Sequence, residues 1–205
     1  MDLIGEAMFD DVHAKISIES IDPFQRGQVA TACLLRVAGL LADDRVRSEF
    51  SEVAELVVQI KDYAVSRAQG SSETDTSDFE RGLRDFLGPS DEPYEELPGV
   101  GAWVMDIASM ADCVLDIWSD ASVSDEKCYE VMVGAYSITG YLEDDSNDPD
   151  VPDLAHGEFR RQMADIAAIR SGDPWQSVVR ESLDLAQAYS HSLVPTRVSL
   201  RCRRT

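Results

Sequence analysis

The sequence predicts an all-α protein, and three observations support that prediction. Apolar residues recur three and four positions apart along nearly the whole chain, whereas the strict alternation typical of a half-buried strand is almost absent. Several apolar runs begin just after a residue that can cap a helix, as with Asp22 and Asp173. Glycines such as Gly70 and Gly172 follow the ends of other runs. We therefore expect a compact bundle of about eight helices, packed as antiparallel helical hairpins.

The first two helices are expected over residues 4–20 and 22–42. The second has a strong start signal, because the Asp22 side chain can accept hydrogen bonds from the free amides of the first turn and a proline follows it. Helical spacing then orients its side chains. Those expected to face the core are Phe24, Cys33, Val37 and Leu41. Those expected to face solvent are Gln25, Gln28 and Arg36.

Two further helices are expected over residues 45–69 and 77–87, and Ser77 is expected to cap the second of them. Residues 89–98 contain three prolines and four acids, so they should be irregular. We expect a single helical-bundle domain over residues 1–196. The stretch at residues 89–98 is the point where two halves of that domain could meet.

The fifth helix is expected over residues 99–119 and is the most apolar in the chain. On a helical wheel its apolar side chains cover one broad face, while Asp106, Asp112 and Asp116 fall in the opposite sector. Such carboxylates can form an acid–base pair, bind a metal ion, or mark a face that meets water or a partner. We favour the third interpretation, because the sector is contiguous and neither a histidine nor a second acidic helix motif accompanies it. We place this helix centrally in the bundle.

Three more helices are expected over residues 122–142, 153–171 and 173–192. The connection at residues 143–153 contains six acids and two prolines, which predicts a solvated acidic loop. Residues 197–205 contain four arginines and no acid. This basic tail could fold back onto the acidic body or extend from it as a terminus.

The chain is strongly acidic, with 39 Asp and Glu against 18 Lys and Arg and a formal net charge of -21. Binding to DNA or RNA depends on basic residues that neutralise phosphates, so this balance argues against a nucleic-acid partner. An anionic membrane surface is disfavoured for the same reason. High charge also keeps a protein soluble, and an excess of Asp over Glu and of Arg over Lys fits a GC-rich or salt-adapted host.

Cysteine usage and the absence of targeting signals predict a cytoplasmic protein. The four cysteines lie far apart and form no C-x-x-C pair, so we expect buried, reduced thiols. The first six residues lack the basic region and apolar core of a secretory signal, and no stretch reaches the length of a membrane span.

No motif predicts a catalytic, metal or cofactor site. The run at residues 144–150 resembles a calcium loop, but Pro149 stands where that loop needs glycine and Ala155 where it needs a bidentate Glu. Ser124 and Lys127 match an S-x-x-K string without the other motifs of serine acyl enzymes. The three histidines fall on different helices without a partner histidine at helical spacing.

Three segments resemble a known family. They are residues 24–50 (FQRGQVATACLLRVAGLLADDRVRSEF), residues 102–118 with Ala-Asp-Cys at 111–113, and residues 157–170 (GEFRRQMADIAAIR), in which Glu158 and Gln162 lie four apart. In order and spacing the chain is similar to the YjaG-like family of uncharacterised bacterial proteins, over roughly residues 9–193. The resemblance implies a compact single-domain helical bundle of about this length. It supplies no catalytic residues.

Our leading hypothesis is a non-enzymatic acidic protein that binds a basic protein partner, most concretely an immunity protein or antitoxin that neutralises a nucleic-acid-targeting bacterial toxin. Such a toxin presents a cationic cleft, to which an anionic helical protein would be steered and which it could cover. The residues expected to bind the partner are Asp91, Glu92, Glu95, Glu96, Glu143, Asp144, Asp145, Asp148 and Asp150, with Asp106, Asp112 and Asp116 as second choice. No cofactor and no metal are expected.

Two alternatives stay open at this point. The chain could be a housekeeping helical protein of unknown role whose acidity reflects the composition of its host. It could also be an enzyme that binds a small molecule or a metal ion in the bundle, which would need a polar cavity with converging carboxylates.

Overall fold

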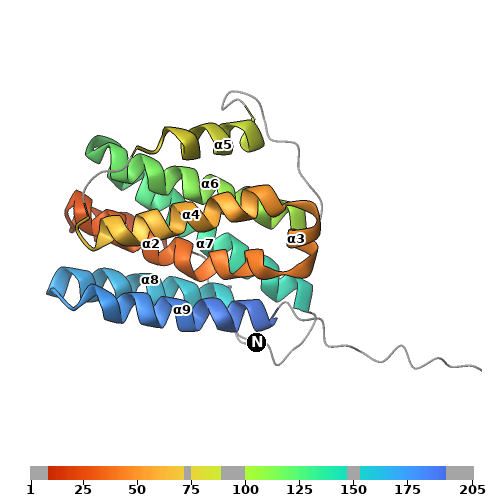
Figure 1. Ribbon diagram of the computed structural model, residues 1–205. Helices are drawn as coiled ribbons and strands as arrows, with labels where there is room; N and C mark the ends of the chain where they lie inside the picture. Colours follow the sequence, from red (N-terminus) through yellow and green to blue (C-terminus); the bar gives the residue numbers. More distant parts are fainter. Residues whose placement is uncertain (1–8, 72–74, 89–99, 147–152, 193–205) are drawn as a thin grey trace, which may run out of the picture.

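The computed structural model describes residues 9–71, 75–88, 100–146 and 153–192, and within these ranges the fold is all-α with no strand (Figure 1). Nine α-helices and two short 3-10 helices, η1 and η2, make up most of the described chain. Their bounds are α1 Asp11–Glu19, α2 Pro23–Ala38, η1 Gly39–Ala42, α3 Asp44–Glu49, α4 Ser51–Ala68, α5 Ser77–Leu87, α6 Val100–Ser119, η2 Ala121–Val123, α7 Ser124–Ser146, α8 Leu154–Ser171 and α9 Trp175–Ser192. The predicted helical bundle is confirmed. Within the described ranges, none of the helices is long and apolar enough to cross a membrane.

Local start and stop signals explain several helix ends. At the start of α2, the Asp22 carboxylate accepts a hydrogen bond from the Gln25 backbone N–H (2.9 Å), and the Gln25 side chain accepts one from the Asp22 N–H (3.1 Å). Helix α8 follows Asp153, whose carboxylate accepts a hydrogen bond from the His156 N–H at 3.0 Å. It ends at Gly172, whose φ of 81° suits a residue without a side chain.

Two predicted helix starts are displaced. Helix α1 begins at Asp11, because the Asp10 carboxylate accepts a hydrogen bond from the His13 N–H and so caps the helix there. Residues 9 and 10 of the predicted helix are therefore not helical, and residues 4–8 lie outside the described residues. Helix α5 was expected to be capped by Ser77, but Thr76 occupies the capping position.

Two further predictions about helix extent are corrected. The helix expected over residues 45–69 is divided at Phe50, whose φ of -130° is not helical, into α3 and α4. Helix α7 continues to Ser146, so residues 143–146 of the predicted acidic loop are helical.

Helix α2 lies at the centre of the bundle. It packs against α4, α6, α7, α8 and α9, and residues 29–38 are buried without interruption. Helix α6, which we expected to be central, packs against α2, α4, α5 and α7. In Figure 1, α5 lies at one edge of the bundle and α8 and α9 at the other. The predicted junction at residues 89–98 and the basic tail at 197–205 lie outside the described residues.

Two side chains of α2 face the opposite way from the prediction. Phe24, expected in the core, is 45% exposed and meets the Trp118 ring edge to face. Arg36, expected in solvent, is completely buried. Other helices surround α2 at Arg36, so no side of α2 faces solvent at that position. The spacing of apolar residues within one helix cannot reveal burial on all sides.

Candidate functional site

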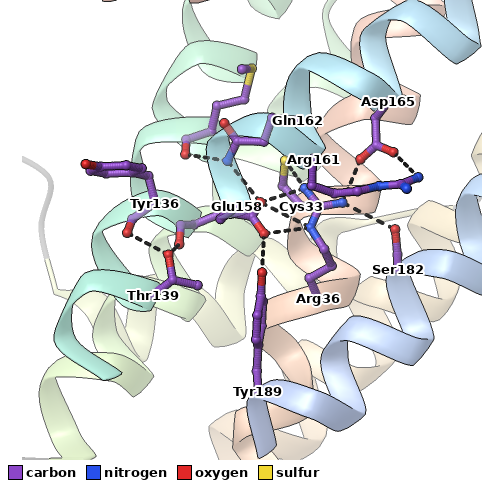
Figure 2. A network of polar contacts seen from close by, with 12 residues as sticks. Cys33, Arg36, Tyr136, Thr139, Glu158, Arg161, Gln162, Asp165, Ser182 and Tyr189 are labelled. Carbon is purple, nitrogen blue, oxygen red and sulfur yellow. Dashed lines mark hydrogen bonds and ion pairs between the residues drawn. The ribbon is translucent and has the colours of Figure 1, made fainter. Parts of the chain in front are cut away.

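A network of buried charged side chains links α2, α8 and α9 in the interior of the bundle (Figure 2). Arg36 forms a two-point ion pair with Glu158, in which Arg36 Nη2 lies 2.6 Å from Glu158 Oε1 and Arg36 Nε lies 2.8 Å from Oε2. Arg36 Nη1 also donates to Asp165 Oδ2 at 2.7 Å. None of the three side chains has exposed surface. One buried guanidinium is therefore matched by two buried carboxylates.

Glu158 accepts two further hydrogen bonds. The Tyr189 hydroxyl on α9 donates to Oε2 at 2.8 Å, and Gln162 Nε2 donates to Oε1 at 3.0 Å. Gln162 Nε2 also donates to the backbone carbonyl of Met132 at 2.9 Å, which attaches α7 to the network. Burial acts to raise the pKa of Glu158, but the charge of Arg36 and the three side-chain donors outweigh burial and hold that pKa below its ordinary value.

Asp165 is neutralised less completely than Glu158. Burial raises the pKa of Asp165, and attraction to Arg36 and Arg161 offsets only part of that rise. Arg161 Nη2 lies 2.5 Å from Asp165 Oδ1, although this oxygen has no partner with hydrogen-bond geometry. Arg161 also pairs with Glu181 on α9, and Glu181 is exposed, so the network reaches the surface on this side.

Two groups in the network that could act chemically are kept protonated. The Cys33 thiol accepts a hydrogen bond from Arg36 Nη2 at 3.3 Å, yet burial raises its pKa well above the ordinary value. Burial also raises the pKa of the Tyr189 hydroxyl, and the neighbouring Glu158 adds to the rise. Because the central charges are enclosed, we assign the network a structural role that joins α2, α7, α8 and α9.

A second cluster of charges lies on the surface formed by α5, α6 and α7. We call the following five residues the acidic face: Glu80, Asp112, Asp116, Asp120 and Glu130. Repulsion from the other acids of this face raises the pKa of Asp112 and of Asp116. Arg84 and Lys127 are the neighbouring cations. The five acids outnumber these two bases, so the acidic face projects a negative potential.

The acids of α6 carry charge that the protein neutralises only in part. Asp112 and Asp116 are half-buried, and burial is the largest cause of the raised pKa of each carboxyl. Lys127 offsets some of this rise. Its Nζ lies 3.9 Å from Asp116 Oδ2 but 2.9 Å from Glu130 Oε2, so Glu130 holds it more closely.

The acidic face continues into a pocket of about 390 Å³ between α1 and α7. Glu130 belongs to both surfaces. The other acids that line the pocket are Glu19, Asp125 and Glu126. Tyr129 lines it as well, with the Lys15 ammonium 4.7 Å from the centre of the ring. The pocket therefore extends the negative surface onto α1.

A larger groove of about 560 Å³ lies between the start of α4 and α5, and we call it the α4–α5 groove. Its apolar lining residues are Phe50, Val53, Leu56 and Phe86. Its charged lining residues are Glu49, Glu52 and Asp85. Among the residues that the structure describes, all the charges that line the groove are therefore negative.

Half of the twelve acids predicted to bind a partner lie outside the described residues: Asp91, Glu92, Glu95, Glu96, Asp148 and Asp150. Glu143 lies in α7, where its Oε1 accepts a hydrogen bond from the Ala155 backbone N–H at 3.0 Å and thereby caps the start of α8. Asp144 and Asp145 are helical residues of α7.

Two of the three predicted acids of α6 lie in the acidic face. Asp112 and Asp116 belong to the acidic face, whereas burial alone raises the pKa of Asp106. The prediction missed three members of the acidic face: Asp120, Glu80 of α5 and Glu130 of α7. Asp120 lies four positions after Asp116, so spacing along the chain could have found it. No local pattern connects Glu80 and Glu130 to α6, because helix packing alone brings them together.

Among the described residues, no group of three or more His, Cys, Asp and Glu side chains is arranged to hold a metal ion. Comparison of the chain with models of protein families, with curated proteins and with solved structures found no match. The function must therefore be inferred from the surface and interior described above.

Proposed function

We propose that this chain is a non-enzymatic binding protein of the bacterial cytoplasm whose acidic face binds a basic protein partner. The most specific form of the proposal is an immunity protein or antitoxin that binds a nucleic-acid-targeting toxin and blocks its cleft. The negative surface and the net charge of -21 support this choice of partner.

The observation that carries the proposal is the incomplete neutralisation of Asp112 and Asp116. A carboxylate with a raised pKa costs free energy when it is ionised in the free protein. Lys127 supplies only part of the compensating charge, because it pairs more closely with Glu130. A lysine or arginine brought by a partner would complete the ion pairs, so binding would recover free energy that folding has lost.

A toxin that acts on DNA or RNA is a partner that would bring such lysines or arginines. Such a protein needs a cationic cleft to hold phosphates, and that cleft attracts any negative surface of suitable shape. Opposite charges also accelerate encounter, which favours rapid capture of the toxin. A rigid helical scaffold would hold the competing carboxylates in place.

Affinity capture from the native host tests the proposal. Tagged wild-type protein, Asp116→Lys and the matched control Asp184→Lys, at an exposed position of α9, are each incubated with host extract at low ionic strength. We expect a basic protein to bind the wild type and the control but much less of it to bind Asp116→Lys. The captured protein should act on DNA or RNA, and the wild-type chain should inhibit it.

Two results would count against the proposal. A captured partner that is acidic, or that binds all three proteins equally, would contradict recognition through the acidic face. A basic partner whose activity on nucleic acid is unchanged by saturating wild-type protein would contradict the immunity or antitoxin role.

A further inference from the structure

The α4–α5 groove combines apolar walls with negative edges. Phe50, Leu56 and Phe86 are half-buried, so apolar surface remains open to solvent. Glu49, Glu52 and Asp85 are exposed around them. Apolar surface gives affinity when it is covered, and charge at its edge selects the sign of the ligand.

The groove is held in shape by close packing between its two sides. A Cβ atom added at Gly82 of α5 would lie 2.8 Å from Leu56 Cδ2, so the two helices approach closely at this point. Beside it, the rings of Phe50 and Phe86 meet edge to face, with centroids 6.4 Å apart and an interplanar angle of 84°. The groove is therefore a preformed feature of the packed helices.

We propose that the α4–α5 groove binds a basic segment of the partner protein, in which lysines or arginines flank one or two large apolar side chains. The charge of the lining carries this choice, because the three charged residues around the apolar floor in the described part of the chain are all acidic. A second copy of this chain fits poorly, since each copy carries a formal charge of -21. The inference rests on the proposed function and names the feature of the partner that would be recognised.

The apolar and charged parts of the groove make separate predictions. Large apolar side chains in a desolvated pocket supply most of the affinity at interfaces, so loss of a groove phenylalanine should weaken binding strongly. Loss of an acid at the edge should weaken binding of every basic peptide, whether or not the peptide is apolar.

Fluorescence anisotropy with defined peptides tests the inference on the full chain. The probe is a labelled synthetic peptide in which two leucines are flanked on each side by two arginines, and the comparison peptide has serines in place of the leucines. We expect Phe86→Ser to weaken binding of the leucine peptide by about tenfold, with little effect on the serine peptide. The matched control is Phe24→Ser, because Phe24 is 45% exposed and packs on Trp118, outside the groove.

A surface variant keeps the test decisive if Phe86→Ser fails to fold. Asp85 is exposed on α5, and Asp85→Lys should weaken binding of both peptides more than Asp184→Lys does. If the wild-type chain does not bind the leucine peptide, or if Phe86→Ser and Asp85→Lys both bind it as the wild type does, the groove assignment is wrong. The proposed function would still stand in either case if Asp116→Lys abolished capture of a basic partner.

Two other occupants would also overturn the assignment. The chain's own basic tail would be the occupant if a full-length variant with Arg197→Ser, Arg201→Ser, Arg203→Ser and Arg204→Ser bound the leucine peptide much more tightly than the wild type does. A second copy would be the occupant if the wild type sedimented as a dimer that Phe86→Ser dissociated. A monomeric wild type with unchanged affinity in the tail variant supports a partner segment.

Discussion

Arg36 occupies a position where an isolated charge would be unstable, because removing an ion from water costs several kcal/mol. Glu158 and Asp165 supply the opposite charges, and neighbouring donors complete the hydrogen bonding of Glu158. Truncating one member of such a network costs roughly 3–5 kcal/mol, since the remaining charges stay buried without compensation. The network therefore ties α8 and α9 to one position on α2.

Tyr189→Phe tests this role at a single hydrogen bond. The substitution removes one donor to Glu158 and leaves the ring in place. Because hydrogen bonds to charged groups contribute about 1.5–3 kcal/mol, we expect the free energy of unfolding at neutral pH to fall by that amount. Urea denaturation measures this fall in the free energy of unfolding. The control is Tyr141→Phe, at a tyrosine that is 45% exposed, and its effect should stay within about 0.5 kcal/mol.

The loss caused by Tyr189→Phe should depend on pH in a defined direction. The pKa of Glu158 lies below its ordinary value of 4.5 in the folded protein, so its stabilising contribution is complete at neutral pH and is lost as pH falls through the folded pKa. The difference between wild type and Tyr189→Phe should therefore shrink in strongly acidic solution. An undiminished difference there would show that the ionised Glu158 is not the group that Tyr189 stabilises.

Asp112 should show the opposite dependence on pH. Its folded pKa is raised, mainly by burial, so its ionisation destabilises the fold and the penalty grows as pH rises through that pKa. Asp112→Asn should raise the free energy of unfolding at neutral pH by less than about 1 kcal/mol, because solvent screens this half-buried group. Thermal unfolding at neutral and acidic pH measures the effect, which should vanish in acid. A destabilised Asn variant at neutral pH would mean that Asp112 is already neutralised within the protein.

At the scale of helices, the sequence predicted the features that depend on neighbouring residues. The cap at Asp22 and the helix end at Gly172 involve residues close together in the chain, and they appear as expected. The break at Phe50 was not predicted, because no glycine or proline marks it.

The prediction failed where packing between distant segments decides the outcome. Arg36 is the only charged residue in the apolar run at residues 29–41, and this isolation was a usable signal of a buried ion pair. Its partners on α8 lie more than a hundred positions away, so the sequence could not identify them by spacing. The acidic face is similar, since Asp112 and Asp116 were predicted to share a sector but Glu80 and Glu130 reach it only through packing.

The contact between α2 and α6 depends on a glycine. A Cβ atom added at Gly27 would lie 2.7 Å from the Trp118 ring, and Trp118 Nε1 donates to Thr31 Oγ1 at 3.2 Å, so the ring cannot easily move. We expect Gly27→Ala to lower the free energy of unfolding by about 1–3 kcal/mol through overpacking, as measured by chemical denaturation.

Gly140 provides the matched control for that substitution. It lies within α7, and apart from its chain neighbours and the nearby backbone of α7, no described atom would come within 4 Å of an added Cβ. Gly140→Ala should therefore stabilise the protein by about 0.5–1 kcal/mol, because alanine restricts the unfolded chain and favours the helix. Equal effects of the two substitutions would show that α2 and α6 are not in the close contact described.

At the scale of the whole molecule, the fold separates two kinds of charge. Inside, Arg36 forms ion pairs with Glu158 and Asp165, and these pairs hold the helices together. Outside, the acidic face, its extension onto α1 and the α4–α5 groove present mainly negative charge among the described residues. This division is what we expect of a rigid scaffold that recognises a cationic protein.

The rate of association with the captured basic partner, measured by stopped flow across a range of salt concentrations, tests this account most directly. Wild type and Asp184→Lys should associate rapidly, with rates that fall steeply as salt rises. Asp116→Lys should associate more slowly and with a weaker dependence on salt. Identical rates and salt dependences for all three proteins would contradict recognition through the acidic face.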